Sequence, residues 1–401
     1  MENSVIQRIY DISDRLIREV DSRFHRFLAQ SLDWNVRILA LSGPRGVGKT
    51  TMFLQFLKEH PEEARNALYV SLDNLWLNAT ELYDLAEHHV KHGGTRLLID
   101  EIHYLPDWQR LMKNLYDNFK ELRIAYTGSS ILRLAEGQGD LSRRQVAYSL
   151  PCMSFREFLN LEYALELPAV GIDELLKNHV DLAAQVTQRI KVIPSFEKYM
   201  KMGCYPFYRE EPEHFSQKLL QVVNQVLDVD LPKTEDVTPE TVRKIRRMLT
   251  ILASSTPQTP NVTALCRNLE MDRKQGLRVL HALRRAGLLG LLAEDAEALK
   301  HLGSPNKIYC DNANLMYALV GNPDKGTSRE AFFNSQFCVG HELSYPKQGD
   351  FRVDGRFLFE VGGLGKGFEQ IADLPESYLA VDDLEVGRGA RIPLWLFGFL
   401  Y

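Results

Sequence analysis

The chain has 401 residues, of which 45% are hydrophobic and 25% are charged, and its formal net charge at pH 7 is −5. A chain of this length exceeds one ordinary hydrophobic core, so we expect two or three domains. The mild negative charge argues against a protein that coats nucleic acid over its whole surface, although it permits local basic patches.

The cysteines and the amino terminus exclude several classes of protein. The five cysteines are scattered without C-x-x-C spacing, which is typical of reduced thiols and not of a zinc site or a disulfide framework. The amino terminus lacks a basic start followed by an apolar stretch, so we expect no signal peptide. No run of about 18 apolar residues occurs, so we expect no membrane span. We therefore expect a cytoplasmic protein.

The chain begins with a predicted helix. Apolar residues recur at helical spacing between residues 5 and 31, which predicts one long amphipathic helix that leads into the first strand. We expect its apolar face to pack against the core.

A phosphate-binding loop is predicted at residues 43–50, where the sequence fits the pattern G-x-x-x-x-G-K-T. The loop follows an apolar run at 38–41, expected to be a buried strand, and precedes a predicted helix at 51–58. This strand, loop and helix context makes the pattern specific, because backbone N–H groups and the helix start can then point at an anion. We expect Lys49 to reach the β- and γ-phosphates and the Thr50 hydroxyl to hold Mg²⁺. The residues predicted to hold the nucleotide are Gly43, Pro44, Arg45, Gly46, Val47, Gly48, Lys49, Thr50 and Thr51.

Two adjacent acids are predicted to complete the site. A second strand is expected at 67–72, and a third at 96–101 ends in Asp100 and Glu101. We expect Asp100 to orient the magnesium shell and Glu101 to activate the attacking water. The alternative is an ordinary acid pair at a strand end. Residues 100–103 also look like a DExH box, but no second helicase core follows, so we interpret His103 as a packing or hydrogen-bonding residue.

Further polar residues follow the next predicted strand, at 123–130. Because ligands sit beyond the carboxyl ends of parallel strands, Ser129 or Thr127 could contact the γ-phosphate or the attacking water. A helix cap or a turn is an equally good interpretation. Arg143 and Arg144 follow Ser142 and a loop at 137–139, and either arginine could supply positive charge to a transferring phosphate, within this subunit or across an interface. A solvated surface pair is the alternative.

These segments together resemble a prokaryotic AAA-type ATPase family, the AAA_14 domain, which is related to archaeal and STAND-like ATPases. The resemblance is carried by the phosphate loop and by residues 98–101, 126–130 and 150–159. The last segment is similar to the family's P-L-S-F-x-E-F-L signature, with Cys152 and Met153 where Pro-Leu is usual. The resemblance implies a core of parallel strands, Mg-ATP binding and hydrolysis. Its functional residues carry over to Gly43, Gly48, Lys49, Thr50, Asp100 and Glu101, and less directly to Ser129, Arg143 and Arg144.

The middle of the chain is predicted to be helical. We interpret 166–235 as a helical lid and 236–320 as a winged helix, with helices at 241–254, 261–269 and 272–286 and wing strands at 288–292 and 307–310. Asp272 is the expected N-cap of the third helix, and Gly287 ends it. This helix carries Arg273, Lys274, Arg278, Arg284 and Arg285. These side chains could face DNA; a solvated basic face on a protein-interaction module is the alternative.

The last part resembles the PD-(D/E)xK nuclease fold and the DUF4143 region that accompanies AAA_14 ATPases. A helix is expected to start at Glu330, with strands at 349–353 and 357–363. In such nucleases an acid pair, here Asp350 and Glu360, holds a divalent metal, and a lysine two residues after the glutamate steadies water. That position is Gly362, with Lys366 four residues further on. We therefore favour an inactive structural or binding domain, and we expect 392–401 to be a closing strand.

We conclude from the sequence that the chain is an α/β protein with a parallel-sheet P-loop ATPase core at 1–165. The helical lid (166–235), the winged helix (236–320) and the nuclease-like α/β domain (321–401) follow. The expected activity is hydrolysis of ATP to ADP and phosphate with Mg²⁺. The alternatives are an ATP-gated switch with negligible turnover and a metal-dependent DNase. Besides the nucleotide, DNA bound through either later domain, a protein partner and a homo-oligomer remain open, and no membrane partner is expected.

Overall fold

A computed structural model describes residues 3–73, 77–129, 141, 143–235, 237–254, 262–268 and 270–401. The chain divides into two compact units, Met1–Pro151 and Cys152–Tyr401. The predicted lid, winged helix and C-terminal domain all fall in the second unit, together with residues 152–165. The sequence-based interpretations of Ser130, Ser142 and the loop at 137–139 lie outside the described residues.

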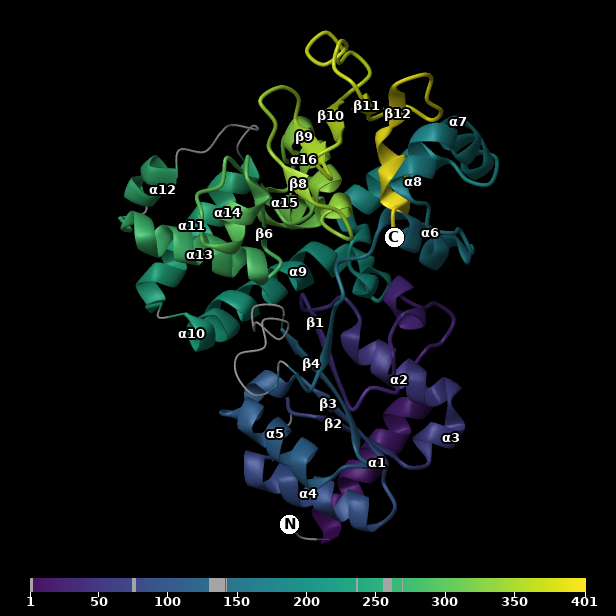
Figure 1. The fold of residues 1–401 in the computed structure, drawn as a ribbon, viewed down its shortest axis with the longest axis vertical. Coiled ribbons are helices and arrows are strands. Elements are labelled where there is room, and N and C mark those ends of the chain that lie inside the picture. The colour runs from purple at the N-terminus through teal and green to yellow at the C-terminus, as the bar shows by residue number, and fades with distance from the viewer. Residues whose placement is uncertain are drawn as a thin grey trace. The chain divides into compact units, whose positions relative to one another are not determined.

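The first unit is built on a sheet of five parallel strands in the order β2-β3-β4-β1-β5 (Figure 1). The strands are β1 (Ile38–Gly43), β2 (Ala67–Ser71), β3 (Arg96–Asp100), β4 (Arg123–Ser129) and β5 (Val146–Ser149). The first four lie where the sequence predicts them, and β5 was not predicted. Because all five run the same way, Gly43, Asp100 and Ser129 end at one edge of the sheet.

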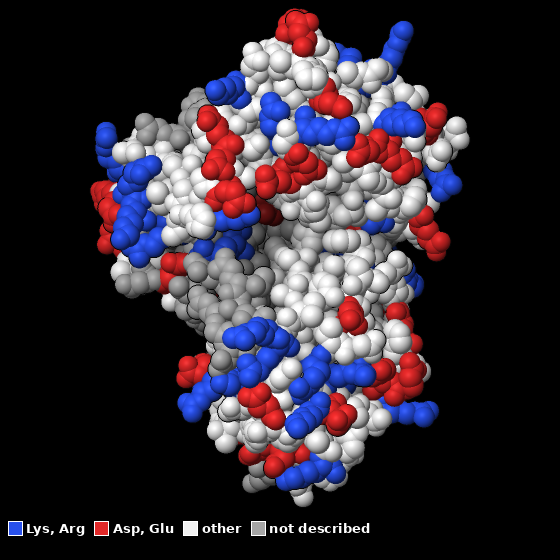
Figure 2. All heavy atoms as spheres, viewed as in Figure 1, with Lys and Arg blue, Asp and Glu red and all other residues white. Residues whose placement is uncertain are grey.

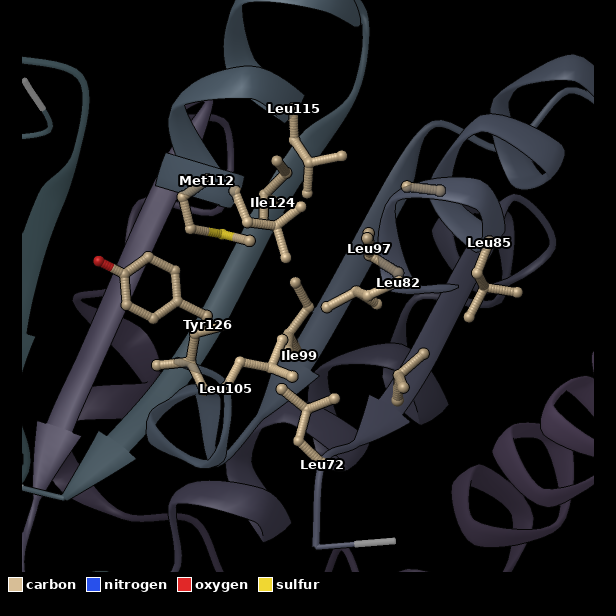
Figure 3. Close-up of a cluster of buried hydrophobic side chains, with 14 of the residues drawn as sticks. Leu72, Leu82, Leu85, Leu97, Ile99, Leu105, Met112, Leu115, Ile124 and Tyr126 are labelled. Carbon is tan, nitrogen blue, oxygen red and sulfur yellow. The ribbon is translucent and has the colours of Figure 1, made fainter. Parts of the chain in front are cut away.

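The described residues of this unit form five helices, and all but α3 pack apolar side chains in its core. They are α1 (Asn3–Glu19), α2 (Lys49–Glu59), α3 (Pro61–Ala64), α4 (Ala79–Lys91) and α5 (Trp108–Asn118). Figure 3 shows side chains of α4 and α5, among them Leu82 and Met112, meeting Leu97, Ile99 and Tyr126 of the strands. All five of these residues are buried. This core fixes the position of β3, which carries the acid pair at its end.

The first helix is shorter than predicted, since α1 ends at Glu19 and not near residue 31. The Gln55 amide on α2 donates to the backbone carbonyls of Asp21 and Phe24, at 2.7 and 2.8 Å. These carbonyls are therefore bonded outside a helix, and only a short 3-10 turn, η1 (Phe27–Gln30), follows. A tertiary contact thus overrides the helical periodicity of residues 20–31.

The second unit begins with helices. They are α6 (Phe155–Tyr163), α7 (Ile172–Thr187), α8 (Val192–Lys198), α9 (Phe215–Gln225), α10 (Leu231–Thr234), α11 (Pro239–Ser254), α12 (Val262–Asn268) and α13 (Arg273–Arg285). The predicted caps of α13 are confirmed, because the Asp272 side chain accepts from Gln275 N and Gly287 has a left-handed φ of 71°. No helix in the described ranges is long and apolar enough to cross a bilayer.

Two small sheets complete the second unit. An antiparallel pair, β6 (Leu289–Leu292) and β7 (Lys307–Cys310), follows α11, α12 and α13, with α14 (Ala296–Lys300) between the strands. After α15 (Ala313–Val320) and α16 (Lys325–Phe337) comes a mixed sheet in the order β12-β11-β10-β9-β8. Its strands are β8 (Leu343–Ser344), β9 (Phe351–Val353), β10 (Phe357–Gly362), β11 (Ser377–Val381) and β12 (Arg391–Pro393).

Two predictions about the last domain are wrong. Helix α16 starts at Lys325 and not at Glu330, because the Asp324 side chain caps it by accepting from Thr327 N at 2.8 Å. The expected closing strand ends at Pro393, and a buried 3-10 helix, η8 (Leu394–Phe399), follows it. An apolar run of this length does not by itself distinguish a strand from a buried helical turn.

The P-L-S-F-x-E-F-L-like segment lies in the second unit and caps α6. Ser154 accepts a hydrogen bond from Glu157 N while the Glu157 carboxylate accepts from Ser154 N, which is a capping box. The Ser154 hydroxyl also donates to the carbonyl of Tyr401 at 2.8 Å, and Arg156 Nε donates to the same carbonyl at 2.8 Å. The segment therefore ties the start of the second unit to the chain's last residue.

Candidate phosphate-binding site

The loop between β1 and α2 has the backbone that the glycines permit. Gly46 and Gly48 have φ values of 81° and 99°, in the left-handed region that side chains with a Cβ rarely adopt. Gly43 leaves no room for a side chain, because a Cβ there would lie 2.4 Å from the carbonyl oxygen of Leu150. Helix α2 then starts at Lys49, so its unpaired N–H groups open toward the loop.

Lys49 lies inside this loop. It is 5% exposed, and its ammonium donates to the carbonyls of Gly43 and Pro44 at 2.9 and 3.0 Å. A buried ammonium group needs such partners. These contacts hold Nζ across the curve of the loop, where a phosphate oxygen could replace the carbonyls as the acceptor.

The Asp100 carboxylate accepts hydrogen bonds from three hydroxyl groups, one of them on α2. Its Oδ2 accepts from Thr50 Oγ1 at 2.6 Å and from Tyr69 OH at 2.9 Å, and its Oδ1 accepts from Thr127 Oγ1. The structure thus brings Thr50 and Asp100 together, as a shared magnesium site requires. Burial and the neighbouring Asp100 raise the pKa of Tyr69 well above its usual range, so the phenol remains a donor.

Thr127 is hydrogen-bonded to the acid pair. Its hydroxyl donates to Asp100 and accepts from the backbone N–H of Glu101 at 2.9 Å, and the residue is fully buried. The Thr127 hydroxyl is therefore bonded to both residues of the acid pair. Ser129 lies directly across from Gly43 in the β1–β4 register, buried beside the start of the loop.

Basic side chains surround the Glu101 carboxylate. Its backbone is left-handed, with φ 56°. Its Oε2 lies 3.0 Å from His103 Nδ1, and its Oε1 lies 3.9 Å from Arg45 Nη1. Burial raises the pKa of Glu101, but His103, Lys49 and Arg45 together outweigh it, so the pKa is lowered. The carboxylate is consequently ionised at neutral pH and able to accept a proton.

Sequence reasoning missed two residues of this site, Tyr69 and Asp73. Asp73 follows β2, and burial together with the neighbouring Glu101 raises its pKa. Neither residue belongs to a motif. The signal that could have found them is sheet order, because residues at the end of β2 neighbour the end of β3 in a parallel sheet.

Arg144 does not lie near the loop within this chain. It precedes β5, whose Val146 pairs with Leu39 at the amino end of β1. Its guanidinium lies 3.4 Å from the Asp117 carboxylate, near the end of α5. At roughly 3.3 Å per residue, this places it about 15–20 Å along the sheet from the loop. Arg143 is its exposed neighbour.

The donor set fits a hard cation. Thr50 and Asp100 offer oxygen atoms only, which suits Mg²⁺, an ion that usually takes one or two carboxylates and completes its shell with phosphate and water oxygens. The described residues contain no group of three or more His, Cys, Asp and Glu side chains that could hold a metal.

Two parts of the chain match known protein families. Residues 35–159 match the AAA_14 family, described as an AAA domain, which supports an AAA-type ATPase domain in the first unit. Residues 193–326 match DUF8612, a domain of unknown function. The expected DUF4143 region is not among these matches. DUF8612 covers part of the predicted lid, all of the predicted winged helix and the first residues of the last predicted domain.

Three proteins of known sequence or structure illustrate what the chain is similar to. Uncharacterized protein MJ1637 of Methanocaldococcus jannaschii is 28% identical over 392 residues, which is 88% of this chain and 81% of the relative. A solved structure of katanin self-assembly is 19% identical and covers 48% of this chain and 73% of its own, with a TM-score of 0.26. AMPPCP-bound DnaA from Aquifex aeolicus is 16% identical and covers 71% and 88%, with a TM-score of 0.23. Structural similarity this low carries no argument about function.

Proposed function

We propose that the chain binds ATP with Mg²⁺ and hydrolyses it to ADP and phosphate. The observation that carries this proposal is the hydrogen bond of 2.6 Å between Thr50 and Asp100, which joins the phosphate loop to the acid pair. The match of residues 35–159 to the AAA domain supports the same function.

Each residue has a definite task in the proposed reaction. Lys49 and the backbone N–H groups of the loop bind the β- and γ-phosphates. Thr50 and Asp100 would hold Mg²⁺, which supplies positive charge to the phosphate oxygens. Glu101 accepts a proton from water as the water oxygen bonds to the γ-phosphorus and the bond to the β-γ bridging oxygen breaks. Ser129, beside Gly43, is proposed to contact the γ-phosphate.

Two variants test this proposal. Lys49→Ala should abolish binding of a fluorescent ATP analogue, because it removes the only lysine that lies in the loop. Glu101→Gln should bind the analogue as wild type does and lower the steady-state rate by at least a hundredfold. Tight binding by the first variant or a normal rate in the second contradicts the assignment.

A switch that binds ATP and hardly hydrolyses it is the second candidate. The contacts of Glu101 with His103 and Arg45 favour it, because they engage the proposed base within the chain. Single-turnover kinetics on the purified protein separate the two functions: a switch would hold ATP intact for many minutes, and an ATPase would release phosphate.

We propose that α11, α12, α13 and the β6–β7 pair form the winged helix, and that the last sheet is the DUF4143-like, PD-(D/E)xK-like domain. The order of three helices followed by an antiparallel pair supports the first assignment. We infer that this unit binds DNA or a protein partner, or joins copies of the chain, in response to the nucleotide.

The acids of the last domain favour a structural role over a nuclease. The Lys307 ammonium lies between Glu330 Oε2 and Asp350 Oδ1, at 2.9 and 3.3 Å, and Lys366 Nζ lies 2.9 Å from Glu360 Oε1. The carboxylates that would bind a divalent metal are thus paired with lysine side chains of the same chain. Incubating the protein with plasmid and Mn²⁺ should give no cleavage beyond that of Asp350→Ala.

A further inference from the structure

A chain of contacts links the phosphate loop to Glu101 through His103, and the proposed reaction gives His103 no task. We propose that His103 and Arg45 are positioning residues, which hold the Glu101 carboxylate for its proton transfer and make its placement depend on the loop. This inference rests on the proposed ATPase function.

The first contact is local to the acid pair. Glu101 precedes a short 3-10 turn, η2 (Ile102–Tyr104), and its left-handed backbone directs it into this turn. Such a conformation is strained in a residue with a Cβ, and strain of this kind concentrates at functional sites. The His103 side chain is 1% exposed and stacks on the Tyr104 ring at 4.7 Å, so its imidazole is fixed beside the carboxylate.

The second contact comes from the loop. Arg45 is the third residue of the loop, and its Nη2 lies 3.2 Å from His103 Nε2 while its Nη1 lies 3.9 Å from Glu101 Oε1. The same guanidinium group also donates to the Tyr104 hydroxyl at 3.3 Å. A single side chain of the loop therefore contacts the base and the residue that holds it.

These contacts determine the tautomer of a neutral His103. A guanidinium group can only donate, so His103 Nε2 accepts from Arg45. The ring proton then lies on Nδ1, which is 3.0 Å from Glu101 Oε2. Glu101 Oε2 and His103 Nδ1 are thus in direct contact. We infer that it is an electrostatic contact that can tighten or open when Arg45 moves.

This arrangement predicts an effect on turnover rather than on binding. In the proposed reaction the phosphates are bound by Lys49 and the loop backbone, whereas His103 contacts the base and Arg45. A merely structural histidine would change stability without selectively changing kcat. A positioning histidine would lower kcat, and a side chain with a donor and an acceptor would restore it.

The test compares His103→Ala and His103→Gln in the full chain, with the exposed His92→Ala as the control. We expect His103→Ala to lower kcat at least tenfold, with KM and the Kd of a fluorescent ATP analogue within twofold of wild type. His103→Gln, whose amide can accept from Arg45 and donate to Glu101, should return kcat to within threefold. A kcat for His103→Ala within twofold of wild type overturns the inference.

A double variant adds a second readout. Because His103 is proposed to act through Glu101, Glu101→Gln with His103→Ala should be no slower than Glu101→Gln alone. A further tenfold loss in the double variant would mean that His103 acts by another route. If His103→Ala fails to fold, His103→Gln against His103→Asn decides, because the shorter amide cannot reach both partners and should be at least fivefold slower.

The failure of this inference differs from that of the proposed function. If wild type hydrolyses ATP and the His103 variants match it, only the positioning role falls. If wild type binds ATP without hydrolysing it, the ATPase proposal and the positioning role fall together and the switch remains.

Discussion

At the scale of single residues, the motif residues could be predicted from the sequence. The residues that hydrogen-bond to them could not. Lys49, Thr50, Asp100 and Glu101 follow from spacing and from the flanking strands. Tyr69 and Thr127 reach Asp100 only because β3 lies between β2 and β4. Sheet order is a tertiary property, and no local pattern in one sequence encodes which strands are neighbours.

Thr127 provides a prediction at this scale. Replacing it with valine keeps the shape but leaves Asp100 Oδ1 without its donor and Glu101 N without its acceptor. Buried groups left unpaired in this way cost about 1–3 kcal/mol. We expect Thr127→Val to lower the thermal midpoint and to lower kcat at least tenfold, measured by calorimetry and phosphate release. The exposed Thr80→Val is the control; equal effects of the two variants would contradict this role.

Asp311 gives a prediction about pH. Burial raises the pKa of Asp311 to about 7, although its Asn312 neighbour lowers it. The folded pKa therefore exceeds the ordinary value of 3.8, and the folded state loses stability as the pH rises between about 4 and 7. Water reaches part of the residue. We therefore expect the folded state to lose about 1–2 kcal/mol in total over this pH range, which is less than ~1.4 kcal/mol for every pH unit would give.

The Asp311→Asn variant tests the sign of this effect. The amide carries no charge at any pH, so the variant should be more stable than wild type at pH 8 and should approach it near pH 4. Urea unfolding at the two pH values measures the difference. A gap between wild type and variant that stays constant with pH would show that Asp311 does not titrate differently on folding.

At the scale of elements, apolar runs predicted β1 to β4 well because each is a short, buried, parallel strand. The ends of elements were predicted less well. Helix α1 stops at Glu19 because Gln55 binds the following carbonyls, and η8 replaces a strand in an apolar run that is buried in either form. For α1, a contact distant in sequence decides the local structure.

The acids and lysines of the second unit connect several elements. Lys307 opens β7, Glu330 is on α16 and Asp350 precedes β9, and the Tyr309 hydroxyl donates to Glu330 at 2.7 Å. Burial lowers the pKa of Lys307, but Glu330 and Asp350 outweigh it and the pKa is raised. The ammonium is thus charged and links the β6–β7 pair to the last sheet.

Removal of this lysine should destabilise the second unit strongly. Lys307→Met leaves Glu330 and Asp350 buried without their cation, and breaking a buried pair in this way costs about 3–5 kcal/mol. The double variant Lys307→Met with Glu330→Gln removes the uncompensated charge, so it should recover part of the loss. Thermal unfolding of both variants measures this. If the double variant is less stable than Lys307→Met alone, the charge linkage is not what holds these elements.

At the scale of the whole molecule, residues 152–165 fall outside the compact unit that contains the predicted phosphate loop. Residues 152–165 were placed in the first domain because they resemble an ATPase signature, yet they pack in the second unit, where Ser154 and Arg156 bind the Tyr401 carbonyl. Family motifs identify a segment but not the body it packs against. That requires contacts between residues more than 240 positions apart.

Because the net charge of the chain is −5, a surface that binds DNA would have to be a local basic patch. Lys and Arg side chains gather at the edge of the face in Figure 2 where Figure 1 places α11 and α13, with a few acids beside them. Arg273 and Arg278 on α13 are exposed, whereas Arg285 is paired with Glu235 at 2.7 Å. If the second unit binds duplex DNA, exposed arginines of α13 are the groups that could neutralise phosphates.

Reversing two of these charges tests the DNA-binding proposal. Arg273→Glu with Arg278→Glu should weaken duplex binding at least tenfold and flatten the slope of log affinity against log salt by about 1.8, for two phosphate contacts. The control reverses the exposed Arg189 and Lys191, which changes the net charge equally, from −5 by −4 to −9. Fluorescence anisotropy with a labelled duplex measures both. Equal weakening would mean that overall charge and not α13 governs binding, and no binding by wild type at low salt would leave a protein partner as the function of this unit.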